Sequence, residues 1–258
     1  MNKRFYIFIL GSFCSFYPFS QEKINQDLFG FCTSNTFTYI DTHDSLFIDK
    51  VNNFSPYVLR FPGGTIGNFY HPKAEAYGFK VSDVLECYSG RFSNRVHVLK
   101  QAAKQRGHTS DYLEDFIKLS KRLNSKVIVN ANVLSSEKDE IIYMLNEFKQ
   151  AGVEVLGVEL GSELSNRAYK KKIESVHDYI LIAKNYSEHI KSFFPDIKIG
   201  VVAAPIKDDM PDRIHDWNMI LSKEISVSYL EILAFPDVAP TFSVSSTGVN
   251  PVIFPSSS

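Results

Sequence analysis

"RFPGGTIGNFYHP", residues 60–72, sets a charged residue at the end of an apolar stretch and follows it with a proline and two glycines. Residues 57–61 predict a short strand, which must end before Pro62 because proline cannot donate to a continuing ladder. Gly63 and Gly64 then allow a sharp turn with positive φ. A charge at the C-terminal end of a strand is typical of active sites in parallel α/β folds. A surface turn whose arginine meets a carboxylate fits this stretch equally well.

The composition is that of an ordinary globular protein. The chain has 258 residues, 44% hydrophobic and 22% charged, with a formal net charge of -1. Such a chain can bury a sizeable core, and it has no basic excess to favour nucleic acid as a partner. No CxxC pair or histidine cluster has zinc spacing, and no GxGxxG or GxxxxGK[ST] stretch follows a predicted strand. We therefore expect no metal, cofactor or nucleotide.

The N-terminus has the layout of a secretory signal peptide. Basic residues within 2–4 precede an uncharged apolar run, and polar residues begin directly after Ser20. We predict a signal peptide over residues 1–20 and a secreted or periplasmic protein, with an uncleaved anchor as the alternative. Because the run is short and interrupted, we expect no stable membrane span. Cleavage would leave Cys32 and Cys87, and the sequence leaves open whether they pair.

From residue 110 onward, helical and strand periods alternate with short connections. Apolar spacing predicts helices over 111–123, 139–150 and 176–194, and strands over 126–133, 153–160 and 197–204. Two capping boxes are predicted, at Ser136 with Asp139 and at Ser175 with Asp178. This alternation predicts repeated βα units around a parallel sheet.

One of these predicted strands leads into "VELGSELSN", residues 158–166. Glu163 stands just past the strand and is reached through Gly161 and Ser162, so its side chain can project at the C-terminal edge of the sheet. Glu159 lies four residues earlier, and we expect it to pack against a polar neighbour. Glu163 is therefore the candidate for chemistry.

Together, "LRFPGGTIGNFY" and "GVELGSE" resemble two motifs of the retaining glycoside hydrolases of the large (β/α)8 clan. The similarity is greatest to the α-L-arabinofuranosidase and heparanase-like β-glucuronidase families, which carry such motifs after the second and fourth barrel strands. The resemblance covers about residues 28–220. It implies an α/β fold of the (β/α)8 TIM-barrel type, hydrolysis of O-glycosidic bonds and a carbohydrate as the partner.

The resemblance also implies roles for individual residues. Glu163 would be the general acid/base, and Arg60 would orient the nucleophile carboxylate. Ser162 stands where the clan has an asparagine that binds the sugar 2-hydroxyl, and a serine offers one donor instead of two. Three asparagines are candidates to contact sugar hydroxyls or, alternatively, to serve as turn and capping residues: Asn68, Asn130 and Asn132.

The strand count predicts an incomplete barrel. Further strands are expected near 28–37 and over 227–235, which gives about six of eight βα units within residues 21–235, followed by an irregular Pro/Ser-rich tail over 236–258. The nucleophile of the clan follows the seventh strand, which the count does not reach, and Glu231 in the sixth is the substitute to consider. Three interpretations remain open: the N-terminal portion of a hydrolase, a non-catalytic carbohydrate-binding relative, and an unrelated α/β protein.

Overall fold

The structure is a computed structural model that describes residues 26–33, 40–88, 97–98, 101, 104–105, 112–205, 212–225 and 230–233. The predicted signal peptide over 1–20 and the predicted tail over 236–258 lie outside these described residues. None of the described helices combines the length and the apolar character needed to cross a membrane.

One parallel sheet of six strands runs in chain order from β1 to β6. The strands are β1 Gly30–Cys32, β2 Val58–Phe61, β3 Lys126–Ala131, β4 Val155–Leu160, β5 Lys198–Val202 and β6 Leu230–Leu233. Each strand pairs in parallel with the next, so all their C-terminal ends lie at one edge, called here the C-terminal edge. The six predicted strands are confirmed. In the described part of the chain β1 and β6 do not pair, so the sheet is open.

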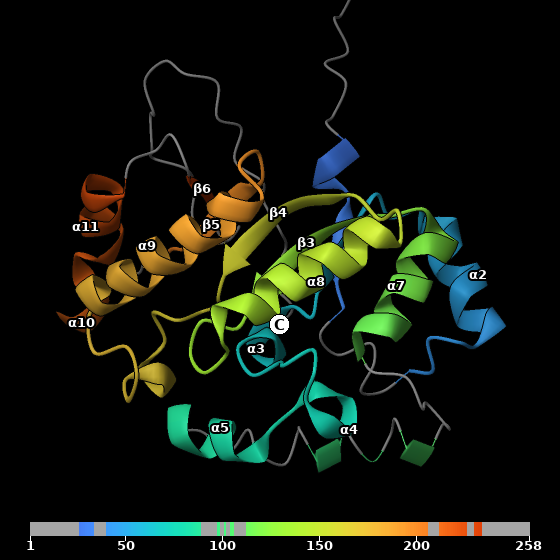
Figure 1. The fold of residues 1–258 in the computed structure, drawn as a ribbon, viewed down its shortest axis with the longest axis horizontal. Coiled ribbons are helices and arrows are strands. Elements are labelled where there is room, and N and C mark those ends of the chain that lie inside the picture. The colour runs from blue at the N-terminus through green and yellow to red at the C-terminus, as the bar shows by residue number, and fades with distance from the viewer. Residues whose placement is uncertain are drawn as a thin grey trace, which may run out of the picture.

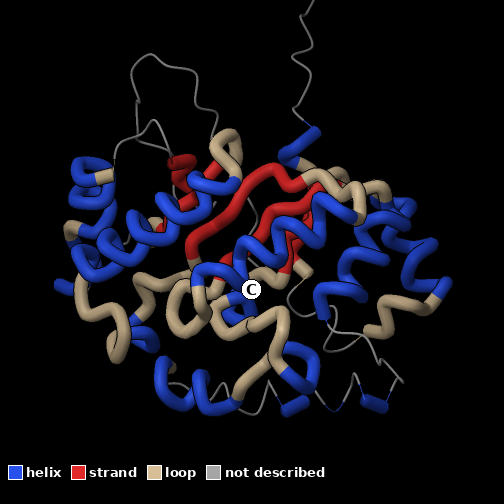
Figure 2. Tube along the Cα trace, viewed as in Figure 1, coloured by secondary structure: helices blue, strands red, loops and turns tan. Residues whose placement is uncertain are grey.

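Helices connect successive strands and cover one face of the sheet (Figures 1 and 2). The described helices are η1 Gln26–Leu28, which precedes β1, α2 Ser45–Phe54, α3 Gly64–Gly67, α4 Glu75–Gly78, α5 Val81–Cys87, α7 Tyr112–Leu123, α8 Lys138–Gln150, η2 Arg167–Tyr169, α9 Val176–Phe193, α10 Asp212–His215 and α11 Trp217–Glu224. Helices α8 and α9 pack on each other and on β4. Repeated βα connections with helices on one face of a parallel sheet are the arrangement found in the wall of a (β/α)8 barrel.

Phe61, the last residue of β2, fastens the strand to the helical layer. Its ring contacts those of Tyr70, Tyr112, Phe116 and Phe148, with centroids 4.4–5.9 Å apart. Successive side chains of a strand point to opposite faces of the sheet. Arg60, which precedes Phe61 in β2, therefore faces the side opposite the helices, called here the inner side. The chain then turns as predicted, with positive φ at both glycines that follow Pro62.

The two predicted capping boxes have different outcomes. At α9 the box is formed: Ser175 Oγ accepts from Asp178 N at 3.4 Å, and the Asp178 carboxylate accepts from Ser175 N at 2.8 Å. At α8 the prediction is wrong, because the helix begins after Glu137 and the Ser136 hydroxyl donates to the Asn132 carbonyl. That carbonyl lies just past β3 and competes with the helix start for the hydroxyl.

His71 fastens the chain beyond α3 to two helices. The ring is 1% exposed, with Nδ1 2.9 Å from Glu140 Oε2 and Nε2 2.8 Å from Asp83 Oδ2. Burial opposes the charge of Asp83, but hydrogen bonds from Ser135, Ser82 and His71 outweigh it and lower the pKa of the carboxyl. Figure 1 shows α3, α4 and α5 gathered on the side toward which the β4 arrow points, which is the C-terminal edge.

Candidate active site at the C-terminal edge

Arg60 of β2 faces the inner side of the sheet and pairs with Glu159 of β4. Its Nε donates to Glu159 Oε2 at 2.5 Å, and Nη2 contacts the same oxygen. The side chains are 11% and 3% exposed, so water scarcely reaches the pair. The expectation that Glu159 packs against a polar neighbour is therefore confirmed. That Arg60 orients a nucleophile stays a prediction, because its carboxylate partner among the described residues is Glu159.

The guanidinium of Arg60 also contacts the ends of two other segments. Nη2 donates to Ser162 Oγ at 3.3 Å, and Nη1 approaches Cys32 Sγ at 3.8 Å. These contacts place Arg60 beside the turn that carries Glu163, at the same edge of the sheet. Cys32 and Cys87 are both free thiols in the structure, so the pairing that the sequence left open is not formed.

Burial and attraction act in opposite directions on this ion pair. Burial disfavours the charge of Arg60, but Glu159 and Cys32 outweigh it and raise the pKa of the guanidinium. Burial raises the pKa of Glu159, and the charge of Arg60 and its hydrogen bond limit that rise. Arg60 therefore remains a cation, and Glu159 is the partner that takes up a proton on acidification.

Glu163 stands three residues beyond Leu160, the last residue of β4, and is exposed. Its φ is 54°, in the left-handed region that non-glycine residues rarely adopt, and the turn begins at Gly161 with φ 91°. A left-handed non-glycine residue is strained by about 1–3 kcal/mol and occurs preferentially at functional sites. Burial raises the pKa of Tyr169, and the charge of Glu163 adds to that rise, so the carboxylate lies near this phenol.

Asn68 is one of the three asparagines predicted to contact sugar or to serve as turn residues, and its carboxamide is fully engaged within the protein. Nδ2 donates to Ser162 O and to the Tyr169 hydroxyl, each at 2.7 Å, and Oδ1 accepts from Ser162 N at 2.8 Å. The side chain is completely buried. Both Nδ2 hydrogens are thus bound within the protein, and the predicted sugar contact of Asn68 stays a prediction.

Asn132 has a local role as well. Its Oδ1 accepts from the backbone N–H groups of Leu134 and Ser135, each at 3.1 Å, which closes a turn after β3. Its Nδ2 donates to Ser135 Oγ at 3.1 Å, and the residue is 2% exposed. Asn132 therefore has the bonds of a turn residue, and its predicted contact with sugar stays a prediction.

Asn130 differs from the other two asparagines. Among the described residues neither atom of its carboxamide has a hydrogen-bond partner, although the side chain is 1% exposed. It lies against Gly67, where an added Cβ would come within 1.7 Å of Asn130 Oδ1. Its predicted contact with sugar stays a prediction.

Strand register relates Glu231 to this region. Asn130 aligns with Glu159, Glu159 with Gly200, and Gly200 with Glu231. Residues aligned across parallel strands share one face, so Glu231 occupies a position on the same face as Glu159. The register therefore keeps Glu231 as the first substitute carboxylate to test.

Sequence reasoning missed two side chains that hold the turn around Glu163. One is Tyr169 of η2, which binds Asn68 as described above. The other is Arg213 of α10, which donates from Nη1 to Ser165 O and from Nη2 to Leu164 O at 3.2 Å and Ile173 O at 2.6 Å. Burial lowers the pKa of Arg213, and Asp178 opposes this shift. Hydrogen bonds from an arginine to backbone carbonyls have no sequence signal, because carbonyls occur at every residue.

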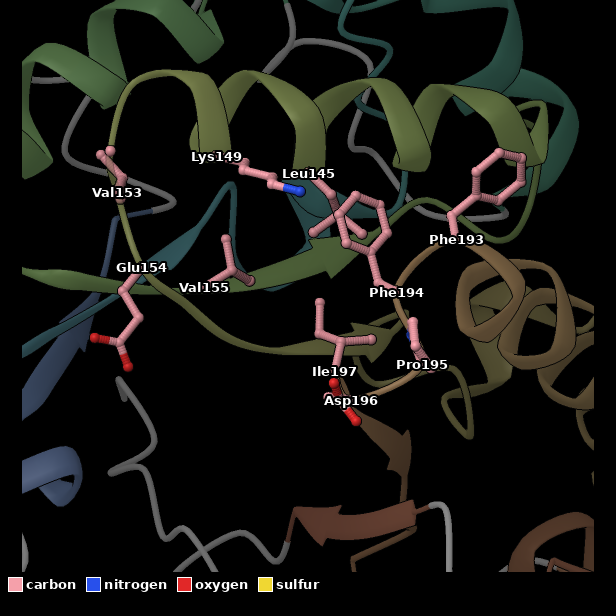
Figure 3. A pocket seen from close by; sticks show the side chains of 11 residues that line it. Leu145, Lys149, Val153, Glu154, Val155, Phe193, Phe194, Pro195, Asp196 and Ile197 are labelled. Carbon is pink, nitrogen blue, oxygen red and sulfur yellow. The ribbon is translucent and has the colours of Figure 1, made fainter.

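A pocket of about 600 Å³ lies at the opposite edge of the sheet (Figure 3). Leu145 and Phe194 line it with Val155 at the start of β4 and Ile197 just before β5. Since all strands run the same way, these strand starts lie at the edge opposite Arg60 and Ser162. The pocket is therefore separate from the candidate site.

Comparisons with known proteins concern the fold. No family model matches the sequence, and no curated protein matches it. Among solved structures, a family 51 α-L-arabinofuranosidase from Bifidobacterium longum is similar with a TM-score of 0.54 and 13% identity, over 82% of this chain and 45% of that chain. The family 51 arabinofuranosidase from Xanthomonas axonopodis pv. citri has a TM-score of 0.53 and 17% identity, over 84% of this chain and 47% of that one.

These similarities establish the class of fold. The chain is an α/β protein whose parallel sheet matches part of the (β/α)8 barrel domain of family 51 arabinofuranosidases. It spans less than half the length of those two structures. The predicted barrel-type fold and the predicted structural similarity to arabinofuranosidases are confirmed, whereas fold alone does not assign chemistry.

Proposed function

We propose that this chain is the N-terminal part of a glycoside hydrolase domain that acts on O-glycosidic bonds of poly- or oligosaccharides, of arabinofuranosidase or glucuronidase type. The observation that carries the proposal is Glu163, an exposed carboxylate on a left-handed turn directly after β4. It lies next to Ser162, which contacts Arg60, in a fold similar to that of arabinofuranosidases. Barrel enzymes build their active sites at this edge.

In this proposal Glu163 is the general acid/base. Glycoside hydrolysis needs one carboxylic acid to protonate the leaving oxygen, and in retaining enzymes a nucleophilic carboxylate about 5–5.5 Å away. Glu163 is free of the ion pair that engages Glu159, so it is available to give a proton to a substrate. Arg60 then holds the turn from the inner side through Ser162 and Glu159.

The test is hydrolysis of aryl arabinofuranosides and aryl glucuronides by the purified chain without residues 1–20. We expect weak glycan binding and negligible hydrolysis, because the second carboxylate of the retaining mechanism is expected after a seventh strand. A longer product that supplies strands seven and eight should be active. In that product Glu163→Gln should impair poor leaving groups far more than good ones, since good leaving groups hardly need protonation. The exposed Glu188→Gln is the charge-matched control.

Robust turnover by the 258-residue chain that disappears in Glu163→Gln would contradict the expected position of the second carboxylate. Glu231→Gln is then the first variant to measure, because register places Glu231 on the face that carries Glu159.

A carbohydrate-binding protein without hydrolytic activity is the second candidate function. It is favoured by Ser162, which is 2% exposed and stands where the resembling enzymes carry asparagine, and by Arg60, whose charge Glu159 already neutralises. Glycan binding that survives Glu163→Gln, together with an inactive longer product, would support this function over hydrolysis. In either case we propose export, on the basis of residues 1–20 alone.

A further inference from the structure

The turn that carries Glu163 is held by a side chain from a distant motif. Asn68 directly follows α3, within the "RFPGGTIGN" stretch, and its carboxamide binds both the N–H and the carbonyl of Ser162. These two residues are 94 positions apart in the sequence. The carboxamide orientation is defined by this pair of bonds, because exchanging Oδ1 and Nδ2 would set two donors against each other.

We propose that Asn68 is a positioning residue that sets the backbone conformation of Glu163 through the Ser162 peptide. The carbonyl carbon of Ser162 is one of the four atoms that define φ of Glu163. Nδ2 of Asn68 donates to the oxygen on that carbon at 2.7 Å and so fixes the plane of the peptide that precedes Glu163. The strained φ of 54° is thereby imposed from outside the turn.

Burial strengthens the pair of hydrogen bonds between the Asn68 carboxamide and Ser162, called here the clamp. Asn68 and Ser162 are 0% and 2% exposed, so water cannot readily replace either hydrogen bond. The second Nδ2 hydrogen goes to the Tyr169 hydroxyl, which leaves the carboxamide no other arrangement that satisfies all its groups. The clamp joins the two motifs of the predicted site, because residues 60–72 supply the Asn68 carboxamide and residues 158–166 supply the Ser162 backbone that it binds.

The chain contains a matched control in Asn218 of α11. Its Oδ1 accepts from Ala204 N at 2.8 Å, and its Nδ2 donates to Ala204 O at 2.9 Å. This is the same two-bond clamp, placed on the peptide after β5 instead of β4. Substitution of Asn218 therefore removes the same chemistry without touching the turn of Glu163.

The experiment compares Asn68→Ala, Asn68→Asp and Asn218→Ala in the ¹⁵N-labelled chain. Two NMR signals report the turn: hydrogen exchange of the Ser162 amide, and the coupling between the amide and α protons of Glu163, which depends on φ. We expect exchange of Ser162 to rise on the order of tenfold or more in Asn68→Ala, with a changed Glu163 coupling. Asn68→Asp keeps the acceptor for Ser162 N and loses both donors, so we expect changes intermediate between those of wild type and Asn68→Ala. This variant also tests the proposal if Asn68→Ala does not fold. Asn218→Ala should leave both signals unchanged.

The role of Glu163 rests on the proposed function, so binding is measured separately. Titration of 4-nitrophenyl α-L-arabinofuranoside and 4-nitrophenyl β-D-glucuronide should show binding weakened on the order of tenfold by Asn68→Ala and not by Asn218→Ala. If the Ser162 and Glu163 signals respond as expected while the wild-type chain binds neither glycoside, the proposed function fails and the positioning of Glu163 stands. Unchanged signals in both Asn68 variants, or equal changes in Asn218→Ala, would overturn the positioning role.

Discussion

At the scale of single residues, the inner face of the sheet is dominated by a buried ion pair. Arg60 and Glu159 are nearly excluded from water, and two nitrogens of Arg60 contact the same oxygen, Oε2, of Glu159. The other oxygen, Oε1, has no partner among the described residues. Desolvation makes such pairs poor sources of net stability, yet the loss of one partner leaves an uncompensated charge in the interior. The pair therefore contributes little to the free energy of unfolding, and its main effect is to favour the arrangement of β2 and β4 in which the two side chains meet.

This pair predicts an asymmetry between single and double substitutions. Glu159→Ala should lower the free energy of unfolding by about 3–5 kcal/mol, because it leaves the Arg60 guanidinium buried without its carboxylate. The double variant Arg60→Met with Glu159→Leu should be clearly more stable than Glu159→Ala, since no buried charge remains. Urea denaturation monitored by circular dichroism measures both. A double variant as unstable as the single one would refute the asymmetry.

At the scale of elements, α9 shows how a local pattern defines a helix start. The helix has 18 residues and begins with a complete capping box, in which Ser175 and Asp178 satisfy backbone N–H groups that have no partner within the helix. Hydrogen bonds from the Ser175 side chain and backbone lower the pKa of Asp178 from its ordinary value of 3.8. The half of the box formed by the Asp178 carboxylate therefore contributes most stability while Asp178 is ionised.

The box at α9 makes a pH-dependent prediction. Ser175→Ala should lower the free energy of unfolding by about 1 kcal/mol at neutral pH. An acid whose pKa is lower in the folded state adds stability above its unfolded value, and this stability is lost as the pH falls through the folded value. The difference between wild type and Ser175→Ala should therefore shrink below pH 3.8. Thermal unfolding measured across about pH 2–7, a range that spans the usual pKa values of carboxyl groups, tests this.

Ser192→Ala provides the control on the same helix. The Ser192 hydroxyl is exposed and donates to His189 O at 2.7 Å, so it has no part in the box. We expect its effect to be small and independent of pH. A difference between wild type and Ser175→Ala that stays constant into acid would show that ionised Asp178 does not contribute.

At the scale of the whole molecule, the sheet formed by the described residues is open. Strands β1 and β6 end the described sheet and do not pair with each other. Unpaired strand edges offer N–H and C=O groups to other chains and are common sites of association. In a complete barrel these edges would be closed by further strands.

We therefore expect the isolated chain to be poorly soluble or to self-associate through β1 and β6. Sedimentation velocity across a dilution series should show species larger than a monomer that dissociate on dilution. The longer product with strands seven and eight should sediment as a smaller number of species, because its edges are paired. A monomeric 258-residue chain that unfolds cooperatively and holds a closed barrel would contradict this expectation.

Local patterns in the sequence were enough to predict the six strands, their parallel order and the position of Glu163 just beyond β4. The hydrophobic period and the positions of Pro62 and the glycines affect only neighbouring residues. They therefore predict strands, helices and turns without knowledge of the tertiary structure. The same patterns misplaced the start of α8, where the carbonyl of Asn132 competed for Ser136.

The partners of the polar side chains depended on the folded chain. Arg60 meets Glu159 across 99 residues, and Asn68 meets Ser162 across 94. Neither pairing follows from spacing, because a parallel sheet brings strand ends together only after the intervening helices have packed. For the same reason the buried hydrogen bonds between Asn68 and Ser162 could not be predicted from the sequence.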